Sequence, residues 1–171
     1  MFAVHVLTAL LLTSQATPPP PPPVAPELRG TNCAVPGERK RLLEQSGAAF
    51  EAVQPIVRAA NAQMEARMKA HADRLVALGV WKEPDVERFT GELLASADFT
   101  AYALKVEAVF SAMLTALETM MAAPQDEEKS CRALLAMLDE VDKSFAIGAE
   151  GWGVIDRAYA AEARRLGVSL E

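Results

Sequence analysis

Residues 127–166, EEKSCRALLAMLDEVDKSFAIGAEGWGVIDRAYAAEARRL, carry the clearest structural signal in the chain. Apolar or small side chains recur there at alternating steps of three and four residues, which is the period of one face of an α-helix. Acidic residues begin the segment and two arginines lie near its end, as the helix dipole favours. The segment therefore predicts one long amphipathic helix. The residues on its apolar face are Cys131, Leu134, Leu138, Val141, Phe145, Gly148, Trp152, Ile155, Tyr159 and Leu166.

Two stretches earlier in the chain show the same periodicity. The first runs from Pro36 to a predicted stop at Gly79, and the second begins near Asp85 and closes at Pro124. The second stretch changes phase at residues 96–98, which indicates either a kink or two separate helices. We therefore expect an all-α fold, an up-down antiparallel bundle of three long helices, with kinks or breaks in them left open.

A shared bend is one hypothesis for the middle of this bundle. If the first and third helices run parallel and in register, Pro55 lies level with Phe145 and just before the glycine cluster of residues 148–153. Proline removes a helical hydrogen bond and glycine weakens a helix, so both helices could bend here and open a pocket. Alternatively, the glycines only make room for Trp152. The predicted pocket is lined by Phe50, Val57, Tyr102, Phe145 and Trp152.

The N-terminal residues resemble a secretory signal. Residues 2–12 are mostly apolar, Ser14 and Ala16 suit signal peptidase, and the run is too short to span a bilayer. No lysine or arginine precedes it. We predict a signal peptide at residues 1–16, a proline-rich linker and lead-in at 17–35, and the helical bundle domain at 36–171. The mature protein would then be periplasmic or secreted, without a transmembrane span.

The chain has two cysteines, Cys33 and Cys131. An even number of cysteines in an exported protein predicts a disulfide, here one that ties the N-terminal lead-in to the start of the last helix. A reactive or metal-binding thiol pair is the alternative. It is disfavoured because no Cys-x-x-Cys spacing lowers the pKa of either thiol.

Charge and motif content narrow the range of functions. Lysine and arginine number 17 against 23 acidic residues, a formal net charge of −6, which argues against nucleic acid as a partner. The mature chain would contain one histidine, His71, so a multi-histidine zinc or iron site cannot form. Haem-attachment, nucleophile-elbow and phosphate-loop motifs are absent. We therefore expect a non-enzymatic protein with no cofactor.

One residue pattern has the chemistry of a metal site. Met64, Met68 and His71 lie at steps of four and three, which places two thioethers and an imidazole on one helix face. Soft sulfur ligands with imidazole suit Cu(I). Methionine also fills gaps in helical cores, and packing is the simpler interpretation of these three residues.

These features together predict an exported helical-bundle protein that acts through contacts with a protein partner or with a second copy of itself. Three long helices leave one side of the layer open, which favours such contacts. The alternative function is binding of a small ligand at the shared bend, or of Cu(I) at Met64, Met68 and His71.

Overall fold

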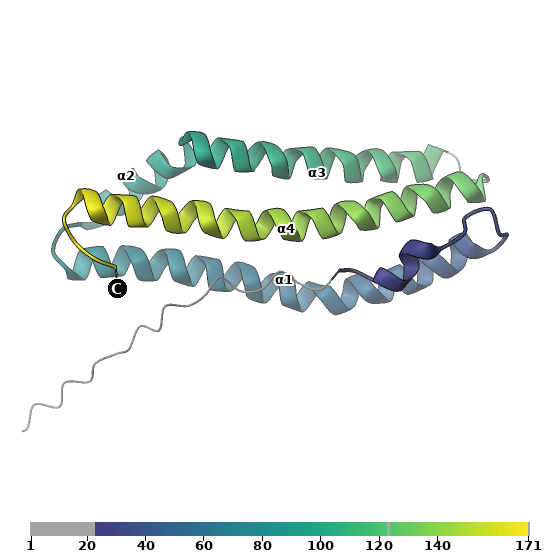
Figure 1. Ribbon diagram of the computed structural model, residues 1–171, viewed down its shortest axis with the longest axis horizontal. Coiled ribbons are helices and arrows are strands. Elements are labelled where there is room, and N and C mark those ends of the chain that lie inside the picture. The colour runs from purple at the N-terminus through teal and green to yellow at the C-terminus, as the bar shows by residue number, and fades with distance from the viewer. Residues whose placement is uncertain (1–22, 123, 171) are drawn as a thin grey trace, which may run out of the picture.

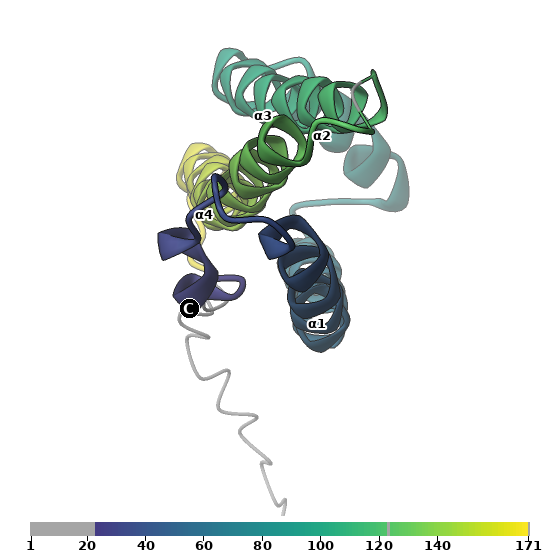
Figure 2. The ribbon, with the colours of Figure 1, turned by 90° about the vertical axis from the view of Figure 1, so that its right-hand side faces the viewer.

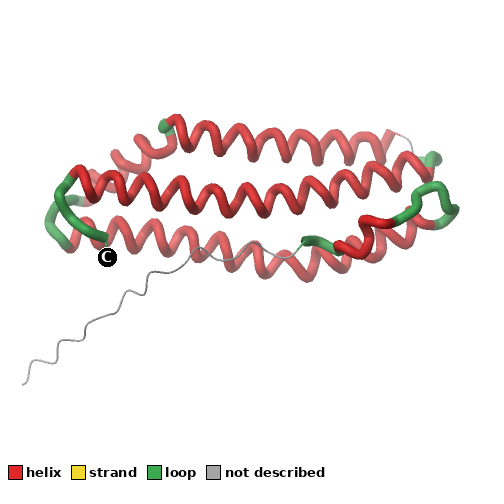
Figure 3. Tube along the Cα trace, viewed as in Figure 1, coloured by secondary structure: helices red, strands yellow, loops and turns green. Residues whose placement is uncertain are grey.

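The computed structural model describes residues 23–122 and 124–170, and these residues form helices and connecting turns without a strand (Figure 3). The predicted all-α class is confirmed. The predicted signal at 1–16 and most of the proline run lie outside the described residues. The elements are a short 3₁₀ helix η1 (Pro26–Gly30) and the helices α1 (Glu38–Ala77), α2 (Glu83–Leu94), α3 (Ala97–Ala122) and α4 (Glu127–Arg165).

The helix ends follow local sequence signals. Gly79 has φ 71° after α1, and its N–H donates to the Val76 carbonyl at 2.9 Å. The Asp126 carboxylate accepts from the Lys129 N–H at 2.9 Å and caps α4. The phase change at 96–98 is a break, because the Ser96 hydroxyl accepts from the Phe99 N–H at 3.2 Å and starts a new helix. The expected second long helix is therefore two helices, α2 and α3.

Helix α4 lies at the centre of the molecule. The main packed pairs of helices are α3 with α4, α1 with α4, and α2 with α3. Figures 1 and 2 show α1 and α3 on different flanks of α4, with α1 parallel to α4 and α3 running the opposite way. The long helices thus pack on a shared central helix, and α1 and α3 are not a main packed pair.

Two clusters of buried side chains lie toward opposite ends of α4. One, called the disulfide core below, joins the N-terminal lead-in, α1 and the first half of α4; its buried members are Val24, Ala25, Leu28, Cys33, Leu42, Val53, Cys131, Leu134, Leu138 and Val141. The other, called the aromatic core below, joins the end of α1, α2 and the second half of α4. Its buried members are Ala72, Leu75, Trp81, Phe89, Leu93, Val154, Ile155, Tyr159 and Ala163.

The described part of the predicted lead-in packs on α4. The Val24 N–H donates to Asp142 at 2.7 Å, and the Arg29 guanidinium lies 2.7 Å from Asp139 and 2.5 Å from Asp142. Cys33 and Cys131 form a disulfide with their Cα atoms 5.6 Å apart, as the sequence predicts. The first described residues are therefore held to α4 by a covalent bond, ion pairs and apolar burial.

Candidate ligand pocket

A pocket of about 240 Å³ lies between α1, α3 and α4, in the middle of the molecule. Its walls come from all three helices, and most of the lining side chains are apolar. Helix α1 contributes Val57, Ala60, Asn61 and Met64; α3 contributes Tyr102, Val106, Val109 and Phe110; α4 contributes Ser144, Phe145, Ile147, Gly148, Ala149 and Trp152.

The pocket matches the one expected from the sequence in four of five residues. Val57, Tyr102, Phe145 and Trp152 line it, whereas Phe50 packs against the disulfide core. The sequence left open whether Pro55 and the glycine cluster kink or break their helices, and neither breaks one, because α1 and α4 are each continuous through these positions. Both helices pack into the disulfide core on one side of these positions and into the aromatic core on the other side. A local weak point therefore does not end either helix.

The glycine cluster makes room for an aromatic ring, but the ring is that of Tyr102 and not of Trp152, which the alternative interpretation of the sequence named. A Cβ atom placed on Gly151 would lie 2.8 Å from the Tyr102 ring, closer than real Cβ contacts. Gly151 therefore lets the ring of Tyr102 rest directly on α4. A Cβ on Gly148, in contrast, would meet no atom within 4 Å, because this position borders the open pocket.

The lining carries no formal charge. Asn61, Tyr102 and Ser144 are its polar residues, and it contains no Asp, Glu, Lys, Arg or His. The Ser144 hydroxyl donates to the Val141 carbonyl at 2.6 Å. Burial raises the pKa of Tyr102, so the phenol is neutral at physiological pH. The pocket is thus an apolar space with three neutral polar groups.

An ion-pair cluster joins α1 and α4 next to the pocket. The Arg67 guanidinium donates to both carboxylate oxygens of Asp156 at 2.8 Å and lies 5.8 Å from the Trp152 ring centre. His71 is stacked on Tyr159 with ring centres 5.1 Å apart, and its Nε2 lies 3.4 Å from Asp156. The cluster thus lies beside Trp152, which forms part of the pocket wall.

The structure places the three predicted copper ligands along α1. Met64 lines the pocket, while Met64 and Met68 both pack against the aromatic core. The contacts of His71 are with Asp156 and Tyr159. Among residues 23–122 and 124–170, no group of three or more His, Cys, Asp or Glu side chains could hold a metal ion. Copper binding by the two thioethers and the imidazole stays a prediction.

Sequence reasoning missed Asp156 because it looked only at apolar positions. Asp156 follows Ile155 on the apolar face of α4, and such a boundary carboxylate is an available partner for a cation on a neighbouring helix. That Arg67 would be the cation depends on how α1 is placed against α4, which periodicity does not determine.

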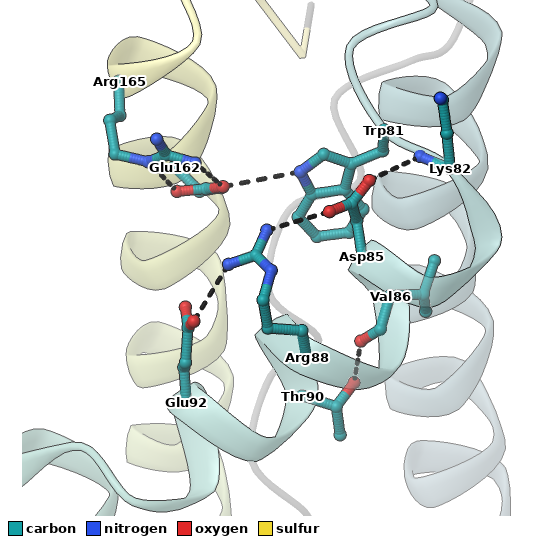
Figure 4. A network of polar contacts seen from close by, with 9 residues as sticks. All are labelled: Trp81, Lys82, Asp85, Val86, Arg88, Thr90, Glu92, Glu162 and Arg165. Carbon is teal, nitrogen blue, oxygen red and sulfur yellow. Dashed lines mark hydrogen bonds and ion pairs between the residues drawn. The ribbon is translucent and has the colours of Figure 1, made fainter.

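A second polar network closes the end of the molecule near the aromatic core (Figure 4). Glu162 is 7 % exposed and accepts from Arg165 at 2.6 and 2.7 Å and from the Trp81 indole at 3.4 Å. The hydrogen bonds from Arg165 lower the pKa of Glu162. Because both carboxylate oxygens are occupied, we interpret this network as structural.

Helix α3 carries several large apolar side chains that are exposed. It buries only Val109 and Ala116 among its 26 residues. Within the described part of the chain it alone is long and apolar enough, by length and composition, to cross a membrane. It nevertheless packs along α4 and carries Lys105, which pairs with Glu150 of α4. The large exposed residues of α3 are Leu104, Phe110, Leu114, Leu117 and Met121.

Comparison of the chain with models of protein families, with curated proteins and with solved structures finds no match. The functional argument therefore depends on the residues and geometry described above.

Proposed function

We propose that this protein is a non-enzymatic, exported binding protein that holds a small apolar ligand in the pocket between α1, α3 and α4. The observation that carries the proposal is an apolar pocket of about 240 Å³ whose walls come from three helices. Its position between the two cores supports the proposal, because packed ends hold the walls apart without a ligand. Pre-formed apolar sites with a few polar groups are typical of ligand pockets.

Two features support export as the setting. The first 16 residues resemble a secretory signal, and the disulfide between Cys33 and Cys131 is of the kind that persists in oxidising compartments. We therefore propose the three-part organisation of signal, lead-in and helical domain, with the helical domain as an up-down bundle around α4. Mass spectrometry of the protein from its own host would show cleavage after Ala16.

Native mass spectrometry of protein purified from the host envelope tests ligand binding. We expect extra non-covalent mass on the wild type, and its loss from a Gly148→Leu variant that fills the pocket. Gly91→Leu is the matched control, since Gly91 is also helical with no atom within 4 Å of its Cβ position but lies away from the pocket. Extra mass that persists in Gly148→Leu would contradict the proposal.

Self-association through α3 is a second candidate function. Phe110, Leu114, Leu117 and Met121 are exposed and follow each other at steps of four, three and four, the spacing of a coiled-coil seam. A second copy of the chain could bury this stripe. Sedimentation equilibrium should then show a dimer that Leu114→Glu dissociates, while a purely monomeric wild type at tens of micromolar would rule this candidate out.

The copper alternative has its own test. A ligand bound only by the folded state raises the melting temperature. Bound Cu(I) should therefore stabilise the wild type but not Met68→Ala. An equal shift in both proteins, or no shift in the wild type, would exclude the site at Met64, Met68 and His71.

A further inference from the structure

We infer that the pocket selects an uncharged ligand of about two fused rings, with aromatic character. This inference rests on the proposed function and specifies the chemistry of the same site. Three properties of the pocket support it: its volume, the aromatic content of its lining and the absence of a charged residue from that lining.

The volume sets the size of the ligand. An enclosed apolar cavity of about 150 Å³ accommodates benzene. The pocket here measures about 240 Å³, which is room for a second ring. A much longer molecule would have to leave the pocket and lie on the surface.

The rings in the wall favour an aromatic occupant. Tyr102, Phe110, Phe145 and Trp152 all line the pocket, although the whole chain has only ten Phe, Trp and Tyr residues. Aromatic pairs gain stability beyond the area they bury when their edges and faces are offset. Two of these rings also have neighbours outside the pocket lining, since Tyr102 lies on Gly151 and Trp152 lies beside Arg67.

The charges around the pocket exclude an ionic ligand. No lining residue is ionised, and two cations of the helices that form the walls have partners: Arg67 holds Asp156 with two hydrogen bonds, and Lys105 pairs with Glu150. A carboxylate or sulfonate entering the pocket would lose its hydration without gaining an opposite charge. The formal net charge of −6 also disfavours anions.

A pair of fluorescent probes that differ only in charge tests the inference. Naphthalene has two fused rings and is neutral, and naphthalene sulfonate is the same molecule with a sulfonate group. We expect saturable binding of the neutral probe to the full-length wild type and at least tenfold weaker binding of the sulfonate. Gly148→Leu should weaken the neutral probe at least tenfold, whereas Gly91→Leu should leave its affinity unchanged.

Two further variants locate the site. Ala60→Leu fills the pocket from the opposite wall on α1 and should also weaken the neutral probe, which keeps the test valid if Gly148→Leu does not fold. Leu114→Gln removes an exposed apolar residue of α3 outside the pocket and should leave binding unchanged. Circular dichroism of each variant checks its helical content.

The possible results separate the inference from the proposed function. Equal affinity for both probes, with both lost in Gly148→Leu, would overturn the inference about charge and leave the pocket function standing. If the neutral probe does not bind the wild type, the inference that the ligand is aromatic is overturned. Native mass spectrometry then still tests whether the pocket holds a ligand. Binding that survives both pocket-filling variants, or that only Leu114→Gln removes, would overturn both claims.

Discussion

The two ends of the molecule are stabilised by different kinds of interaction. The disulfide core combines aliphatic side chains with a covalent bond and the ion pairs of Arg29. The aromatic core has no covalent link and instead packs Trp81, Phe89 and Tyr159 as tilted rings with ring centres 4.8 to 6.1 Å apart. Between them lies the pocket. The difference shows that the ends can hold α1 and α3 on α4 while the middle is left incompletely filled.

The largest expected loss of stability comes from removing the disulfide at one end of the molecule. The disulfide spans 98 residues, and replacing both cysteines by serine should lower the free energy of unfolding by about 4 to 5 kcal/mol in the loop-entropy model. Urea unfolding with and without reductant measures this loss. A midpoint that does not move on reduction would show that non-covalent packing alone holds the lead-in.

Removing the Trp81 side chain from the aromatic core should lower the free energy of unfolding nearly as much. Trp81 is 3 % exposed, so Trp81→Ala should destabilise the protein by about 3 to 5 kcal/mol. Phe110→Ala is the control on α3, because Phe110 is 58 % exposed and its loss should be nearly neutral. Equal losses in the two variants would mean that α3 is buried in solution, as self-association requires.

The aromatic end should also be the more acid-sensitive of the two. The folded-state pKa of Glu162 lies below the ordinary glutamate value of 4.5, because Arg165 donates hydrogen bonds to the ionised carboxylate. This contribution to stability is present above pH 4.5 and is lost as the pH falls through the folded-state value. Unfolding curves between pH 6 and about 3 should therefore show a smaller acid-induced loss in Glu162→Gln than in the wild type.

The partly exposed Glu38 and Asp85 also have lowered pKa values, from the hydrogen bonds of Arg41 and of the Lys82 backbone N–H respectively. Their effects should be small, because water screens them. If the stability of the wild type and of Glu162→Gln falls equally at low pH, the acid sensitivity comes from such surface pairs instead.

Two glycines in the middle should respond in opposite directions. Gly148→Ala should stabilise the protein by about 0.5 to 1 kcal/mol, because alanine suits a helix better and the new methyl group enters open space. Gly151→Ala should destabilise it by about 1 kcal/mol, since the clash with the Tyr102 ring outweighs the same helical gain. Thermal unfolding of both variants measures the difference, and stabilisation by both would show that Tyr102 moves freely.

Several residues that line the pocket could be predicted from the sequence alone. Val57, Phe145 and Trp152 could be predicted from the sequence because periodicity shows which face of each helix is apolar. Equal spacing from the helix starts then places these residues at a common level along the bundle. The hypothesis for the cause of the pocket was a bend shared by two helices at Pro55 and the glycine cluster, and both helices run on through these positions without a break. The positions were therefore predicted from the sequence, whereas the shared bend stays a prediction.

Local chemistry in the sequence determined the helical class, the end of α1 at Gly79, the cap at Asp126 and the pairing of two cysteines, because each depends on neighbouring residues or on a unique partner. Only the tertiary structure decided that α1 and α3 both pack on α4, that Arg67 pairs with Asp156, and that Gly151 accommodates Tyr102. Those outcomes join residues far apart in the chain, and periodicity specifies the buried face of a helix without specifying which helix covers it.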